Sequence, residues 1–161
     1  MVEQYDQHKM IVYNIPQHQA IDIIEGNAYR FIGDSSLLGE GFLQSFHLLP
    51  SRVMHGVIPK DSISNTCIRD HLITGAQRSV LVIDGPVNFT PVAQRIPVDI
   101  IILSGNPKIY LTQLATVFDC KQYIFDNSNP LWKIRYWKKD ADSLHLRHHT
   151  ISEQGAFEVD L

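Results

Sequence analysis

Short apolar runs separated by polar turns fill the first half of the chain, a pattern typical of β-strands. The runs expected to form strands cover residues 10–15, 20–24, 29–32, 66–73 and 79–83. Glu25-Gly26-Asn27 is a turn of the kind that closes a hairpin, and Gly75-Ala76-Gln77 separates the last two runs. The pattern therefore predicts several strands joined by tight turns.

A helix is expected between the third and fourth of these strands. Asp34-Ser35-Ser36 can cap its start. The apolar residues at helical spacing are Leu38, Phe42, Leu43 and Phe46. Gly39 and Gly41 weaken this helix, and Pro50 is expected to end it. A loop punctuated by Pro86, Pro91 and Pro97 follows the run at 79–83.

The second half alternates strand and helix more clearly. The run at 98–103 is apolar except for Asp99, as in a strand covered on both faces. Asn106-Pro107 and Asn129-Pro130 each resemble an N-cap followed by proline in the first helical turn. The first predicted helix carries the apolar stripe Leu111, Leu114, Ala115 and Phe118. The other expected elements are a strand at 122–125, a helix at 130–140 and strands at 144–149 and 156–159.

Successive strand–helix–strand units imply right-handed crossovers and a largely parallel sheet, so the fold class is α/β. The length of 161 residues suits one domain. We assign residues 10–161 to it and 1–9 to a polar lead-in. The formal net charge of −3 is unlike a generally basic surface, so any nucleic-acid contact must come from a local patch.

Cys67 and Cys120 lie far apart and form neither a disulfide framework nor a zinc-ligand spacing. No run approaches the ~18 apolar residues that span a bilayer, and the first nine residues are too polar for a signal peptide. We therefore expect a soluble chain with inert, buried thiols.

Residues 13–21 (YNIPQHQAI) fill the frame of a strand that reads L-D-V-G-Q-G-D-A-I in a known family. With several further segments in the same order, they resemble the C-terminal metallo-β-lactamase-like domain of ComEC-type competence proteins. The other similar segments are 29–34, 64–69, 81–85, 99–106 and the closing Gly155-Ala156-Phe157. Residues 42–48 and 129–133 resemble the ComEC branch from Bacteroidetes.

The resemblance implies a shortened metallo-β-lactamase-like sandwich of mixed sheets with flanking helices. It also implies a parent protein with several membrane spans that passes single-stranded DNA inward. This domain would lie on the periplasmic side of the inner membrane, and its partners would be the rest of that protein and, weakly, single-stranded DNA.

The metal ligands of the family are missing at the matching positions. A working site needs H-x-H-x-D-H and two further histidines to hold the metals that activate water. Between Asp34 and Ser64 stand only His47 and His55, and the family's H-H-G has become Ser104-Gly105-Asn106. Asp84, at the bridging-aspartate position, is the one ligand retained. We expect Asp84, Ser104 and Asn106 to be remnants of the ancestral site, with no bound metal or cofactor.

Two other histidine positions have ordinary structural explanations. His148 and His149 are neighbours on a predicted strand and point to opposite faces, so they cannot chelate one ion without a bulge. His18 is interpreted as an exposed turn residue.

The segment 132–139 mixes aromatic and cationic residues. Stacking combined with phosphate contacts is how proteins hold single strands without sequence preference. The candidate contacts are Trp132, Lys133, Arg135, Trp137, Lys138 and Lys139. The alternative is an amphipathic helix whose aromatics pack on the sheet while its lysines stay solvated, and the negative net charge favours it.

Two hypotheses follow for function. The first is a non-catalytic domain, with a structural or interaction role, in a membrane protein of DNA uptake. The second is a metal-dependent nuclease whose ligands have moved. The missing ligands favour the first.

Overall fold

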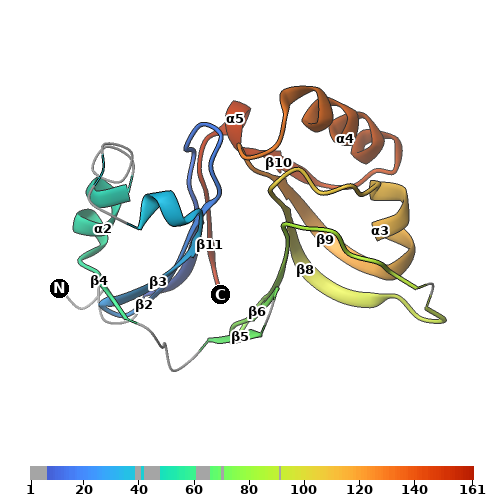
Figure 1. Cartoon of the computed structure of the whole chain (residues 1–161). Coiled ribbons are helices and arrows are strands. Elements are labelled where there is room, and N and C mark those ends of the chain that lie inside the picture. Colours follow the sequence, from blue (N-terminus) through green and yellow to red (C-terminus); the bar gives the residue numbers. More distant parts are fainter. Residues whose placement is uncertain (1–6, 39–40, 42–47, 61–65, 70, 91) are drawn as a thin grey trace.

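A computed structural model of the chain describes residues 7–38, 41, 48–60, 66–69, 71–90 and 92–161. Within these residues two mixed β-sheets face each other, and helices lie on the outer side of each (Figure 1). The predicted α/β fold, with mixed sheets and flanking helices, is confirmed. No helix of the described residues is long and apolar enough to cross a membrane.

The first sheet has the strand order β11-β1-β2-β3-β4. Its strands are β1 (His8–Val12), β2 (Ala20–Glu25), β3 (Ala28–Gly33), β4 (Ile58–Pro59) and β11 (Phe157–Asp160). β2 and β3 form the predicted hairpin, in which Glu25 pairs with Ala28 across Gly26 at a φ of 59°. β11 runs antiparallel to β1, so strands from the two ends of the chain are neighbours.

The second sheet has the order β10-β9-β8-β7-β6-β5. Its strands are β5 (Cys67–Arg69), β6 (Leu72–Thr74), β7 (Ser79–Ile83), β8 (Ile96–Leu103), β9 (Phe118–Phe125) and β10 (His148–Thr150). β7 to β10 are parallel, as the alternation of strand and helix predicted. The crossovers carry α3 (Leu111–Val117) and α4 (Leu131–Ser143), and the short α5 (Ile151–Gln154) follows β10.

Three apolar layers hold the sheets and helices together. β8 shows the alternation, because Ile100 and Ile102 pack toward the first sheet while Ile101 and Leu103 pack under α3 and α4. A third cluster, with Ile24 and Leu37, lies on the outer side of the first sheet. The order of layers is therefore helix, sheet, sheet, helix, as Figure 1 shows.

A buried ion pair fastens α2 (Leu49–His55) to the first sheet. The guanidinium of Arg52 donates two hydrogen bonds of 3.0 Å to the carboxylate of Asp22, which is fully buried in β2. The hydroxyl of Tyr13 donates a third, 2.8 Å long. Because both charges are buried and depend on each other for hydrogen bonds, the pair constrains where α2 lies.

Two positions in the first half differ from the expected elements. Pro50 lies in the first turn of α2, where a residue without an N–H donor is tolerated, and most of the helix that it was expected to end lies outside the described residues. The run at 66–73 is divided between β5 and β6, which pair antiparallel. Of the helix predicted after Asp34, the structure describes only the 3-10 turn Ser35–Leu37, since residues 39–40 and 42–47 lie outside the described part.

Neither predicted asparagine caps a helix. Asn106 has a left-handed backbone with a φ of 57°, and the N-cap of α3 is Tyr110. The N-cap of α4 is Pro130, one residue after Asn129. Asn106 and Asn129 instead join the loops at the ends of neighbouring strands, which is a tertiary role that local sequence does not encode.

Candidate functional site

The loops that follow β7, β8 and β9 meet at one edge of the second sheet. Parallel pairing sets Ile83 beside Leu103, and Leu103 beside Phe125. Asp84, Ser104 and Asp126 are the next residues along each strand, so they lie in a row at the carboxyl ends, where open α/β sheets place their sites. The amide of Ser104 donates to the carbonyl of Ile83 over 3.0 Å.

The most buried ionisable group of this row is Asp126, which is 1% exposed. Its carboxylate accepts hydrogen bonds from the hydroxyls of Ser104 and Ser128. The amide N–H of Ser128 and the side-chain NH₂ of Asn129 also donate to it, over 3.0 and 3.3 Å. Burial raises the pKa of Asp126 to about 6, the hydroxyl donors oppose that rise, and the negative charge of Asp34 adds to it.

The same loops are joined by their backbone groups. The N–H of Gly105 donates to the hydroxyl of Ser128 over 2.7 Å, and the N–H of Asn106 to the side-chain oxygen of Asn129 over 2.9 Å. Gly105 has a φ of 70°, and a Cβ there would lie 3.0 Å from the carbonyl oxygen of Asp84. Both backbone N–H groups are therefore hydrogen-bonded to side chains of the loop after β9.

Two histidine–carboxylate pairs lie near this edge. His18 contacts Asp34 over 2.8 Å, and His71 contacts Asp84 over 3.4 Å. His18, interpreted from the sequence as an exposed turn residue, is instead partly buried and has a carboxylate partner. Among the described residues, no three His, Cys, Asp or Glu side chains gather closely enough to hold a metal ion.

The structure brings the three predicted remnants together. Asp84 and Ser104 follow neighbouring strand ends, and Asn106 lies two residues further, where its side chain accepts a 2.9 Å hydrogen bond from Lys133. Sequence reasoning missed Asp126 and Ser128. The available signal was the polar run that follows the buried end of β9 directly.

His148 and His149 lie on opposite faces, as the strand alternation predicted. His148 stacks on Phe125 and contacts Asp142 over 2.9 Å. His149 contacts the carbonyl oxygen of Gly155 over 2.9 Å.

The aromatic and cationic segment forms most of α4, and its members are separated by burial. Trp137 is fully buried, packs against Phe125 and donates its indole N–H to the carbonyl of Ile109 over 3.1 Å. It cannot stack on a nucleobase, so its inclusion among the nucleic-acid contacts is wrong. Trp132, in contrast, is 68% exposed.

The four cations of α4 also differ. Lys138 forms an ion pair of 2.6 Å with Glu153. Arg135, Lys138 and Lys139 line a shallow hollow together with Asp142. Lys133 faces the other way, with its ammonium 5.4 Å from the ring of Trp137. The segment is therefore not one continuous cationic surface.

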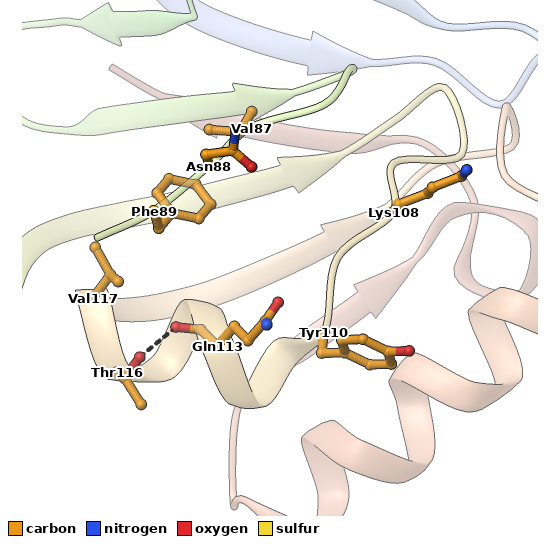
Figure 2. A pocket seen from close by; sticks show the side chains of 8 residues that line it. All are labelled: Val87, Asn88, Phe89, Lys108, Tyr110, Gln113, Thr116 and Val117. Carbon is orange, nitrogen blue, oxygen red and sulfur yellow. Dashed lines mark hydrogen bonds between the residues drawn. The ribbon is translucent and has the colours of Figure 1, made fainter. Parts of the chain in front are cut away.

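Two adjoining hollows lie beside α3 and α4, and both are lined by Lys108 and Tyr110. The first hollow, of about 430 Å³, lies between the loop after β7 and α3, and Figure 2 shows Phe89 on one side and Gln113 on the other. The second hollow, of about 420 Å³, is lined by Trp132, Lys133 and Tyr136 of α4. Lys108, Tyr110 and Tyr136 were not predicted as site residues.

Residues 10–161 match the family model described as the ComEC C-terminal domain. No curated protein and no solved structure matches the chain.

Proposed function

The chain belongs to the family of ComEC C-terminal domains, and on that premise we propose that it is a non-catalytic domain of a membrane protein of competence DNA uptake. Its role there is structural or one of interaction. The observation that carries this proposal is the hydrogen-bonded network of Asp126, Ser104, Ser128 and Asn129 at the strand ends.

In this network the carboxylate oxygens of Asp126 already accept hydrogen bonds, so few of their lone pairs are free to coordinate a metal. A catalytic metal needs several imidazole or carboxylate ligands with free lone pairs and an open position for water. Asp126 accepts bonds from three neighbouring residues, and Ser104 offers a neutral hydroxyl in place of an imidazole. Asp84 keeps a carboxylate, with His71 as its neighbour. One carboxylate beside one imidazole is too small a ligand set for hydrolysis.

The order of layers and the position of the row at the strand ends support a lactamase-like scaffold. Under this proposal Asp84, Ser104 and Asn106 are remnants of an ancestral metal site. The partner is the remainder of a polytopic membrane protein, and the domain lies on its periplasmic side. Single-stranded DNA is a second, weakly bound partner.

Metal content tests the proposal. Protein purified without chelator is expected to hold substoichiometric zinc and manganese by elemental analysis, because too few ligands converge among the residues that the structure describes. The metal content of Asp84→Ala is expected to equal that of the unchanged protein and of Asp119→Ala, which removes an exposed carboxylate of β9.

A relocated nuclease site predicts the opposite result. One tightly held metal per chain, lost in Asp84→Ala and kept in Asp119→Ala, would contradict the non-catalytic proposal. Cleavage of single-stranded DNA on addition of manganese, also lost in Asp84→Ala, would do the same.

A further inference from the structure

Lys108 and Tyr110 line both of the hollows beside α3 and α4, and the residues around them indicate which kind of ligand the hollows bind. Among the described residues that line the hollows, the only charged side chains are Lys108 and Lys133. The chain as a whole has a net charge of −3. Two cations without a carboxylate in the same lining make this surface complementary to an anion.

The two lysines are close enough to influence each other. Burial lowers the pKa of Lys133, and the charge of Lys108 lowers it further. Lys133 donates to the neutral amide oxygen of Asn106 over 2.9 Å. A bound anion between these ammonium groups would relieve their repulsion.

Exposed aromatic rings surround the same cations. Trp132, Tyr110 and Tyr136 are 68%, 55% and 50% exposed, and the two tyrosine rings meet edge to face with centroids 6.4 Å apart. Aromatic rings left in water at a hollow offer stacking faces to flat ligands. In the first hollow, the exposed amide side chains of Gln113, near Tyr110, and of Asn88, beside Phe89 on the opposite side, add hydrogen-bonding groups (Figure 2).

We propose that the two hollows bind successive bases of single-stranded nucleic acid, with Tyr110 between the bases and Lys108 and Lys133 on the phosphates. This inference rests on the proposed role in DNA uptake and adds a surface to it. Repetition favours a chain ligand, because two hollows of similar volume share one lysine and one tyrosine. The site lies away from Arg135 and Lys139, which line a different hollow.

The test is a fluorescence titration of the full chain with a short labelled oligothymidylate, and in parallel with an abasic oligonucleotide of the same length. The abasic strand keeps the phosphates and lacks the bases. We expect dissociation constants of ~10⁻⁴–10⁻⁶ M for the thymidylate and weaker binding of the abasic strand. Quenching of the exposed Trp132 should accompany binding of the thymidylate only.

Variants separate stacking from charge. Tyr110→Ala is expected to weaken thymidylate binding roughly 5- to 150-fold and to change abasic binding little, because one base loses its stacking face. Lys108→Ala should weaken both ligands and reduce the salt slope by about 0.7. The matched control, Lys139→Ala on α4, removes the same charge outside the two hollows. It should change the affinity for either ligand by no more than about twofold. Unchanged far-ultraviolet circular dichroism and an unchanged midpoint of denaturant unfolding verify the fold of each variant.

Three results would overturn the proposal. They are equal affinity for the thymidylate and abasic strands, unchanged binding by Tyr110→Ala, and a loss confined to Lys139→Ala. Binding to phosphatidylglycerol vesicles without binding to the oligonucleotide would instead make this a membrane-facing surface and would also overturn it. None of these results changes the metal content, which tests the non-catalytic role separately.

Discussion

Asp126 shows how strongly a single carboxyl group depends on its surroundings. It is almost wholly buried, so its charged form loses hydration, and the hydroxyls of Ser104 and Ser128 replace only part of it. The pKa of Asp126 accordingly rises to about 6. The folded chain therefore binds a proton at this residue in a pH range where the unfolded chain, with an ordinary aspartate, has released it.

This difference predicts a pH-dependent stability. Because the folded state holds the extra proton between pH 4 and 6, the contribution of Asp126 to the free energy of unfolding falls as pH rises through that window. The fall is up to about 3 kcal/mol. Asp126→Asn cannot titrate at this position. The free energy of unfolding of the unchanged protein minus that of Asp126→Asn should therefore fall by that amount as pH rises from 4 to 7. Denaturant unfolding at pH 4, 5, 6 and 7 measures it, and a constant difference across this range would contradict the prediction.

At the scale of the elements, α2 is held by the ion pair of Arg52 with Asp22. The guanidinium also lies 4.1 Å from the centroid of the Tyr29 ring, so it contacts both an acid and an aromatic face of the sheet. A buried ion pair adds little net stability over an apolar replacement, but removal of one partner leaves an uncompensated charge. The pair therefore determines the position of α2 more than the stability of the whole.

Removal of the cation alone is expected to be costly. Arg52→Met should lower the free energy of unfolding by about 3–5 kcal/mol, because Asp22 stays buried without its cation and, among the described residues, keeps the hydroxyl of Tyr13 as its side-chain donor. The double variant Asp22→Asn with Arg52→Met should be more stable than Arg52→Met alone. Arg30→Met, at an exposed position of β3, is the control and should change stability by less than about 0.5 kcal/mol. Equal losses in the single and double variants would show that the ion pair does not constrain α2.

At the scale of the whole molecule, the end of the chain lies between the two sheets. Leu161 is buried, and its amide N–H donates to the carbonyl of His8 over 3.0 Å. On its other side it touches the turn between β6 and β7, where a Cβ on Gly75 would lie 2.7 Å from the Cβ of Leu161. Arg78 of the same turn donates to the carbonyl of Asp160 over 2.6 Å. The turn of one sheet thus fits closely against the last residues of the other.

A methyl group at this junction has no room. Gly75→Ala should lower the free energy of unfolding by about 1–3 kcal/mol, because the backbone of Leu161, 2.9 Å from the added carbon, must move. Gly85→Ala is the matched control, since a Cβ there meets nothing within 4 Å. Denaturant unfolding of both variants measures the difference. Equal stability of the two variants would mean that the sheets do not meet closely at Gly75.

The sequence by itself determined the features that local apolar pattern, turn residues and family resemblance encode. The turn Glu25-Gly26-Asn27 between two apolar runs predicted the hairpin of β2 and β3, and the apolar run of β8 predicted a strand covered on both faces. The family resemblance identified Asp84 and Ser104 as remnants of one site, and the structure places them after neighbouring strand ends. Family resemblance placed the chain among ComEC C-terminal domains, which the family model confirms over residues 10–161.

Tertiary structure alone decided which side chains are free to act. Trp132 and Trp137 look alike in the sequence, yet the fold buries one against Phe125 and leaves the other in water. Lys138 meets Glu153, and Asp126 gathers donors from two strand-end loops. Such contacts join positions far apart in the chain, and no local pattern records them, because burial and charge pairing are fixed only when distant segments pack together.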